Sequence, residues 1–298
     1  DLWDFVRVSG NLAWAVGSLG TVLKTDNAAE IGALTWTKVD FGLPLPERYN
    51  WRALATSGSQ HVWVAGKGGV VIHSSDGGTS WQKQEGDATA SWNDIEVVQD
   101  GTATLVVLAG DKGRTLYSIN RGLTWETRGN TFTTNNLYAL AFTSYTDGWA
   151  VGAGGWMMRT FNSGVSWAQE GAGQTLNALR GIHIPQASHV WLVGDANTVM
   201  RSYTDGLAWT VMEPCSPGTI TQYNAIRIAV ALATGWMVGE NGMICQLRPG
   251  YDTWYTQQDR TGAPLRRIST IPEDPFPIIV GDFGAVIRYR GTPPPPPP

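Results

Sequence analysis

Short apolar segments alternate with glycine-rich turns along the whole chain. Seven of these segments end in a glycine, usually followed three residues later by a second one. The first glycines of the seven copies are Gly17, Gly66, Gly110, Gly152, Gly194, Gly239 and Gly281, which lie 42 to 49 residues apart. This period is typical of one four-stranded propeller blade. The pattern therefore predicts an all-β fold, a seven-bladed β-propeller of antiparallel four-stranded blades.

Blade two shows the expected strand order most clearly. Its strands are predicted at 51–57, 61–65, 70–74 and 80–84, each a short run rich in β-branched, aromatic or alternating residues. The turn at 66–69 contains three glycines, which accept the positive φ angles that a tight hairpin requires. The other blades are expected to repeat this order.

The seventh blade is predicted to be incomplete in this chain. After its third strand the sequence reaches Thr292 and six prolines, and proline cannot donate to a strand ladder. Trp3 aligns with Trp51, so the N-terminal segment is expected to be the first strand of blade one. Either blade seven has three strands, or residues upstream of Asp1 complete it. We expect the propeller to span 1–291 and a polyproline tail or linker, serving as a tether, to span 292–298.

The tryptophans repeat with the same period. Of the 15, five precede the repeat glycine by three residues, six close the corner between third and fourth strands, and three open a first strand. Large rings at repeating positions fill the wedge between twisted blades. Trp156 is outside this pattern and is expected to be exposed. It is either an anchor for a partner or packed on Leu137 or Met157 of its own blade.

The corner between the third and fourth strands carries a motif with a structural meaning. Residues 74–81 match the Asp box, S-x-D-x-G-x-x-W, at every defined position. Asp76 is expected to accept backbone N–H groups of its own turn, as Asx turns do. The motif is completed by Ser74, Gly78 and Trp81, and looser copies contain Asn120 with Trp125, Asn162 with Trp167, and Trp209. This is the chemistry of a turn, not of catalysis.

The glycine phrase combined with the corner motif resembles the photosystem II stability and assembly factor family of seven-bladed propellers. The resemblance covers 1–291, and segments 63–69 and 149–155 carry it best. It implies a non-enzymatic propeller that is exported to a lumen, a periplasm or the extracellular space. There it would dock, as a scaffold or assembly subunit, on a larger membrane-embedded complex. Asn197 in place of the second glycine and the missing last corner depart from the pattern.

First strands line the central channel of a propeller, and one register near their start is polar. It contains Asp4, Arg52, Asn93, Tyr138, Arg180, Asn224 and Arg266. Three converging arginines with a tyrosine support a second hypothesis, a glycan-binding or sialidase-like glycoside hydrolase. A polar ring is also what any water-filled channel mouth tolerates. The sialidase Arg-Ile-Pro signature is absent, and seven blades replace the usual six.

The family resemblance and the absence of a complete catalytic set favour a binding role over an enzymatic one. Neither a P-loop, a dinucleotide fingerprint nor a nucleophile elbow is present, and no cofactor is expected. The four histidines show no metal-ligand spacing and are expected at the surface or at strand edges. We assign no catalytic residue and no metal ligand. The candidate partner-binding residues are Arg52, Arg180, Arg266, Tyr138 and Trp156.

Composition and charge exclude other functions. A formal net charge of −4 with only 15% charged residues argues against a nucleic-acid partner. No apolar run approaches the roughly 20 residues of a membrane-spanning helix. The chain opens without an initiator Met, which suggests a mature exported product.

Two smaller features leave alternatives open. Cys245 occupies a core position and is expected to be a buried thiol, with a bridge to Cys215 as the alternative. Acids follow the repeat glycine in four blades and should share one rim of the disc. They are Asp111, Asp195, Glu240 and Asp282. We expect them to be solvated turn residues, the alternative being a patch for a basic partner.

Overall fold

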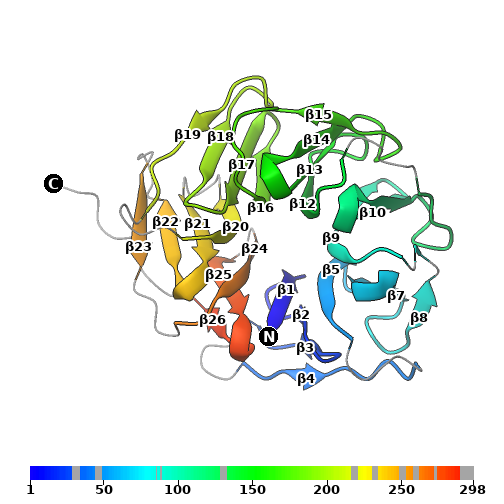
Figure 1. The fold of residues 1–298 in the computed structure, drawn as a ribbon. Coiled ribbons are helices and arrows are strands. Elements are labelled where there is room, and N and C mark those ends of the chain that lie inside the picture. Colours follow the sequence, from blue (N-terminus) through cyan, green and yellow to red (C-terminus); the bar gives the residue numbers. More distant parts are fainter. Residues whose placement is uncertain are drawn as a thin grey trace.

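Seven small antiparallel sheets form a closed ring around a central channel (Figure 1). The computed structural model describes residues 1–288 except 29–33, 44–48, 85, 88, 128–132, 216–220, 230–233, 248–252, 258–261 and 272–273. The predicted seven-bladed β-propeller is confirmed. The predicted tail at 292–298 lies outside the described residues.

Each blade runs from an inner first strand to an outer last strand. Blade one contains β1 (Leu2–Arg7), β2 (Ala13–Gly17), β3 (Val22–Thr25) and β4 (Thr37–Lys38). Blade two contains β5 (Trp51–Ser57), β6 (His61–Gly66), β7 (Val71–Ser74) and β8 (Gln82–Gln84). Blade three contains β9 (Trp92–Asp100), β10 (Ala103–Gly110) and β11 (Thr115–Ser118). Blade four contains β12 (Leu137–Phe142), β13 (Gly148–Gly152), β14 (Met157–Thr160) and β15 (Ala168–Glu170).

The second half of the ring repeats the same order. Blade five contains β16 (Leu179–Gln186), β17 (His189–Gly194), β18 (Val199–Ser202) and β19 (Thr210–Val211). Blade six contains β20 (Tyr223–Ala229), β21 (Thr234–Gly239), β22 (Ile244–Leu247) and β23 (Trp254–Gln257). Blade seven contains β24 (Leu265–Ile271), β25 (Asp274–Gly281) and β26 (Val286–Arg288).

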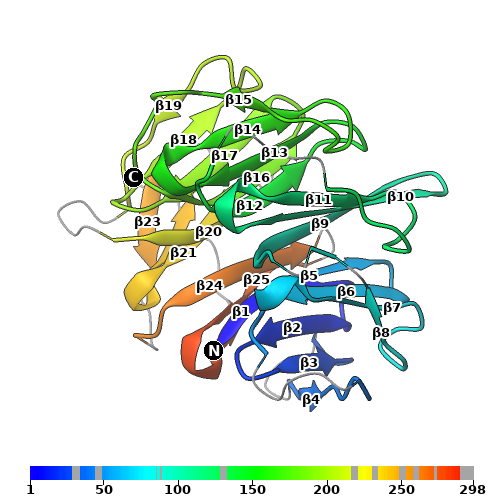
Figure 2. The ribbon, with the colours of Figure 1, turned by 45° about the vertical axis from the view of Figure 1, so that its right-hand side comes forward.

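Two blades have three strands in the described part of the chain. In blade seven this agrees with the expectation from the proline run. In blade three the fourth strand is reduced to a single antiparallel bridge between Tyr117 and Glu126. The long hairpin of β9 and β10 extends away from the body of this blade (Figure 2).

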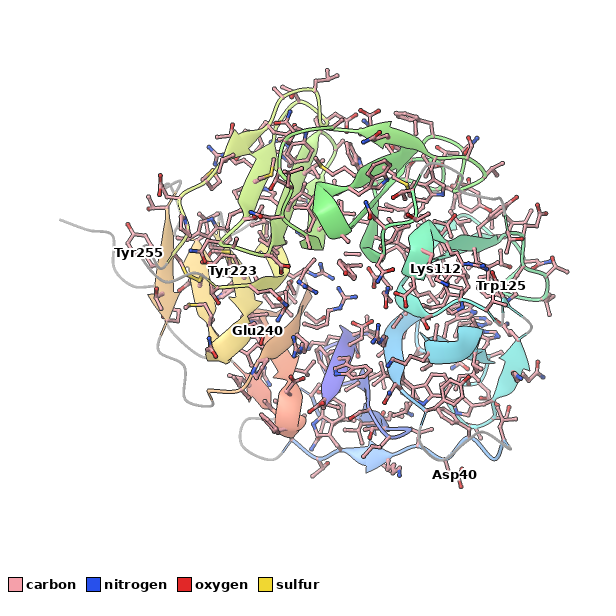
Figure 3. The ribbon with its side chains drawn as sticks, viewed as in Figure 1. Asp40, Lys112, Trp125, Tyr223, Glu240 and Tyr255 are labelled. Carbon is pink, nitrogen blue, oxygen red and sulfur yellow. A yellow bond between two sulfur atoms is a disulfide. The ribbon has the colours of Figure 1, made fainter. Side chains whose placement is uncertain are left out.

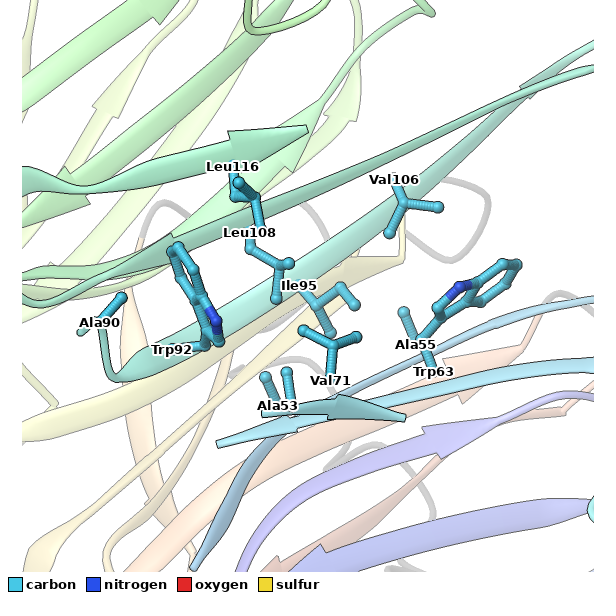
Figure 4. Close-up of a cluster of buried hydrophobic side chains, with 11 residues drawn as sticks. Ala53, Ala55, Trp63, Val71, Ala90, Trp92, Ile95, Val106, Leu108 and Leu116 are labelled. Carbon is cyan, nitrogen blue, oxygen red and sulfur yellow. The ribbon is translucent and has the colours of Figure 1, made fainter. Parts of the chain in front are cut away.

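The blades are held together by tryptophans at the predicted positions. The ring that precedes the glycine of one blade meets the corner ring of the next blade edge-on, with centroids 6.0–6.1 Å apart. These pairs are Trp14 with Trp81, Trp149 with Trp209, and Trp191 with Trp254. Figure 4 shows a matching cluster between blades two and three, with Trp63 and Trp92 among aliphatic side chains. Packing between blades therefore supplies the core.

The corner of blade two has the expected hydrogen bonds. Asp76 Oδ1 accepts the backbone N–H groups of Thr79 and Ser80 at 3.0 and 2.8 Å. Gly78 has φ +89°, and a Cβ there would come within 2.3 Å of the Trp14 ring. Glycine at this position therefore satisfies both the backbone conformation and the packing.

The two cysteines form a disulfide, so the expectation of a free core thiol at Cys245 is wrong. Cys215 follows the outer strand of blade five, and Cys245 lies in β22 of blade six. Their Cα atoms are 6.1 Å apart, within the normal range for a bridge. The disulfide thus links two neighbouring blades. Sequence separation alone could not show that the residues meet, because their contact arises from the stacking of blades.

Candidate channel-mouth site

A β-bulge recurs at the start of every first strand. In each blade the first residue of this strand pairs with the repeat glycine, and the pairing register then shifts by one residue. The extra residues are Trp3, Arg52, Asn93, Tyr138, Arg180, Asn224 and Arg266. A bulge re-aims a side chain, and all seven of these side chains line one cavity at the channel mouth.

This cavity has a volume of about 330 Å³ and is also lined by Gln222 and Arg267. Six of the seven residues predicted from the polar register are therefore brought together. The prediction for the seventh, Asp4, is wrong by one residue, because the bulge residue of blade one is Trp3. Leu2, not Trp3, corresponds to Trp51, because each pairs with the repeat glycine of its blade. Trp3 consequently belongs to the mouth, where Figure 3 shows many polar side chains around the channel.

The acids after the repeat glycine pair with the bulge residues of their own blades. Arg180 makes a two-pronged ion pair with Asp195, at 2.6 and 3.1 Å. Arg266 does the same with Asp282, at 3.1 and 2.5 Å, and also reaches Glu240 at 2.6 Å. The expectation that these acids are only solvated is wrong. They neutralise two of the three mouth arginines instead of offering a free acidic patch.

Arg52 differs from the other two arginines. Blade two has Lys67 where blades five and seven have an acid after the glycine. Within the described residues, the contacts of the Arg52 guanidinium are a 2.7 Å hydrogen bond to Asn93 Oδ1 and a stacking contact 5.3 Å from the Trp3 ring centroid. In the part of the chain that the structure describes, one mouth arginine is therefore left without a carboxylate.

Below the mouth, three buried charged residues cross the channel. Arg267 donates to Asp4 at 2.9 Å and to Asp94 at 2.5 Å, so it connects blades one, three and seven. Asp4 also accepts the backbone N–H of Leu54, and Asp94 accepts that of Leu140, both at 2.7 Å. Burial raises the pKa of Asp4 to about 6, while the charge of Arg267 opposes this rise. We call these three residues the channel strut.

Glu96 lies deeper in the channel and allows the effect of burial on a carboxyl pKa to be tested. Burial, and then the nearby charge of Asp94, raise the pKa of Glu96 to about 8 from its ordinary 4.5. The folded protein therefore holds a proton on Glu96 that the unfolded chain loses above pH 4.5. Its contribution to stability is complete below pH 4.5 and is lost as the pH rises through 8.

We expect Glu96→Gln to raise the free energy of unfolding at pH 9 and to change it less at pH 5, because the glutamine never ionises. Urea denaturation followed by tryptophan fluorescence at both pH values measures the difference. The matched control is Glu126→Gln, which removes a carboxylate from outside the channel. An equal gain at both pH values for Glu96→Gln would contradict a raised pKa.

The prediction that the histidines lie at the surface or at strand edges holds for His61 and His189, the first residues of β6 and β17, but not for His183. His183 lies in the channel wall, where its Nδ1 accepts the backbone N–H of Ile228 at 3.1 Å. His61 and His73 form a hydrogen-bonded pair over the ring of Trp63, with ring nitrogens 3.1 Å apart. Among the described residues, no three His, Cys, Asp or Glu side chains form a group that could hold a metal.

Trp156 is not exposed, so the prediction of an exposed ring is wrong. Its ring is half-buried against the cluster that contains Leu137 and Met158, and its indole nitrogen is buried. It follows the turn at Ala153–Gly155, on the same face as the mouth, but does not line the mouth cavity. The structure thus agrees with the alternative in which the ring packs on its own blade. Its part in partner binding stays a prediction.

Sequence reasoning missed Trp3 and the channel strut. One signal was available, since the residue after each bulge position reads Asp4, Ala53, Asp94, Ala139, Gly181, Ala225 and Arg267. Three charges among otherwise small residues indicate an ion-pair layer. The sequence did not indicate that they meet across the channel.

No protein-family model matches this chain. A segment is 26% identical over 123 residues to the rice (Oryza sativa subsp. japonica) protein "Photosystem II stability/assembly factor HCF136, chloroplastic". That match covers 41% of this chain and 28% of the length of the rice protein.

Solved structures match over nearly the full length. A structure described as "YCF48 bound to D1 peptide" has a TM-score of 0.79 and 17% identity, covering 98% of this chain and 92% of the other. The structure of YCF48 from Cyanidioschyzon merolae has a TM-score of 0.74 and 17% identity, and the match covers 97% of this chain and 94% of the other. A virginiamycin B lyase from Staphylococcus aureus has a TM-score of 0.78 at 12% identity, and the match covers 96% of this chain and 94% of the other. These structural similarities show the fold and do not choose between binding and catalysis.

None of the helices in the described part of the chain is long and apolar enough to cross a bilayer. The chain therefore resembles a photosystem II stability/assembly factor in sequence over part of its length, and the YCF48 structures in fold over nearly all of it.

Proposed function

We propose that this protein is a non-enzymatic propeller that binds a segment of a partner protein at the channel mouth and so assists the assembly or stability of a larger complex. The observation that carries the proposal is Arg52, a mouth guanidinium that has no carboxylate partner among the described residues and is held between Asn93 and the Trp3 ring. A guanidinium in this setting can bind a carboxylate through two hydrogen bonds. The docked segment would supply that carboxylate.

The comparisons support a protein partner. The rice relative is named a photosystem II stability and assembly factor, and one similar structure is described as bound to a D1 peptide. By analogy, the partner of this chain is a subunit of a membrane-embedded photosynthetic complex. The protein would then act in a lumen, a periplasm or the extracellular space, with the proline tail as a tether.

The glycosidase hypothesis is less well supported by the geometry. A sialidase-like site needs three arginines free to hold one carboxylate. Here Arg180 and Arg266 are already occupied by Asp195, Asp282 and Glu240. The Arg180 guanidinium lies over the Tyr138 ring, 5.1 Å from the ring centroid. Turnover of a sialoside that is abolished by Arg180→Ala would reverse this conclusion.

The test of the proposed function is Arg52→Gln. We expect the substitution to weaken binding of a fluorescent D1 peptide by about ten- to a hundredfold, because one charge-assisted contact contributes roughly 1.5–3 kcal/mol. Fluorescence anisotropy at low and high salt measures it, and the salt dependence should be smaller in the variant.

The matched control is Lys67→Gln, which removes an equal charge from the exposed turn of the same blade. Trp156→Ala belongs in the same series, and a loss of binding at an unchanged melting temperature would assign that ring to the interface. If Arg52→Gln and Lys67→Gln bind equally well, Arg52 is not the docking group.

A further inference from the structure

The turn after each repeat glycine contains two successive residues with positive φ. In six blades the second of these is glycine, and in blade five it is Asn197. The first is glycine in blades two and four, and Lys112, Ala196 and Asn241 occupy it in blades three, five and six. Blades one and seven place Leu19 (φ +56°) and Phe283 (φ +57°) there.

Leu19 and Phe283 each combine two independent unfavourable features, a strained backbone conformation and an exposed apolar side chain. Bulky side chains rarely adopt positive φ, because the Cβ approaches the following carbonyl oxygen. Both side chains are also turned toward solvent, with 65% of Leu19 and 87% of Phe283 exposed. Glycine would remove the strain, as the equivalent turns show. Strain held in a bulky exposed residue is a reason to look for a ligand.

Leu19 and Phe283 lie in equivalent turns of neighbouring blades, and Asp1 bonds to both turns. Asp1 accepts the backbone N–H of Phe283 at 3.1 Å through its side chain, and that of Ser18 at 3.0 Å through its carbonyl. The two turns are therefore joined by one residue, two positions before Trp3. Leu19 also donates its N–H to Asn50, which lies two positions before Arg52. The turn that contains Leu19 is thus bonded to the segment that leads directly into Arg52.

We propose that Leu19 and Phe283 form an apolar subsite next to Arg52, so that the docked segment is an extended peptide with a carboxylate flanked by apolar side chains. This inference rests on the proposed function and specifies its partner. Charge complementarity selects the occupant, because a carboxylate satisfies Arg52 while its apolar neighbours cover the exposed pair. Each covered side chain leaves water, which favours binding roughly in proportion to the apolar area buried.

The experiment uses three fluorescent peptides in one glycine–serine frame. The first has an aspartate between leucine and phenylalanine, the second an aspartate between serines, and the third an asparagine between leucine and phenylalanine. We expect the native protein to bind the first peptide about tenfold or more tightly than either of the others.

The key variant is the double substitution Leu19→Gly and Phe283→Gly. It should lose the preference for apolar flanks but keep the preference for aspartate over asparagine, whereas Arg52→Gln should do the reverse. The double variant should also denature at a higher temperature, because glycine relieves the backbone strain. A variant that is more stable yet binds less well cannot be explained by misfolding.

Two controls match these changes. Ala196→Gly relieves positive φ at the same turn position of blade five, and should raise stability without changing binding. Leu207→Ser removes an exposed leucine (91%) from a third-to-fourth-strand corner and should change neither preference.

Three outcomes distinguish the apolar subsite, the proposed function and contacts between copies of the chain. A double variant that keeps the apolar preference overturns the apolar subsite while the proposed function stands. Equal binding of the aspartate and asparagine peptides by the native protein contradicts the proposed function. Concentration-dependent self-association in ultracentrifugation that the double variant abolishes, without any effect on peptides, assigns the pair to contacts between copies and also overturns the subsite.

Discussion

Replacing Arg267 with methionine is expected to lower the free energy of unfolding by about 3–5 kcal/mol, because it leaves two buried carboxylates without their shared cation. The side chains of Asp4 and Asp94 are only 7% and 8% exposed, and each also accepts a backbone N–H from the next blade. Without Arg267 their negative charges repel each other across the channel. Chemical denaturation at pH 7 measures the loss.

The neighbouring residue provides the control. Arg266→Met removes an arginine whose ion pairs lie at the more exposed mouth, where the effect on stability should be about 1 kcal/mol or less. Adding Asp4→Asn and Asp94→Asn to Arg267→Met should recover part of the lost stability. Equal losses for the two single variants would contradict a structural role for the strut.

Trp81→Ala is expected to destabilise the fold by about 3–5 kcal/mol, as large-to-small core substitutions do. The Trp81 ring is 5% exposed, lies edge-on to Trp14 and Phe41, and donates its indole N–H to Gly78 at 3.1 Å. Truncation would leave a cavity between blades one and two. Thermal and urea denaturation both measure the effect.

The control for this change is Leu207→Ala, because Leu207 belongs to the equivalent corner of blade five but is exposed. Its effect should stay within about 0.5 kcal/mol. An unaltered melting temperature for Trp81→Ala would show that the corner ring does not contribute to packing.

The fold was predictable because a propeller repeats one local pattern. A single motif predicted a glycine turn at Gly78 and a packed ring at Trp81, and looser copies of it marked the corners of blades three to five. The errors arose where the local pattern contains no information about which residues pair. The register of blade one was misjudged because Trp3 looks like Trp51, yet the bulge moves it from the core to the mouth.

The candidate site was predictable in its membership but not in its chemistry. The polar register correctly indicated that Arg52, Arg180 and Arg266 converge. Which of them is free depended on the residue that follows each repeat glycine, and that residue faces the arginine only after the hairpin closes. Ion pairing within a blade therefore decided the charge that the mouth presents.

The sequence by itself determined the number of blades, the strand order and the packing role of the tryptophans, because all three depend on short-range periodicity. The tertiary structure decided the disulfide between Cys215 and Cys245, the channel strut through Arg267, and the unpaired state of Arg52. These features join residues of different blades, or of opposite ends of one hairpin. Contacts of that kind arise only when the ring closes, since neither hydrophobic periodicity nor motif spacing contains the distances across it.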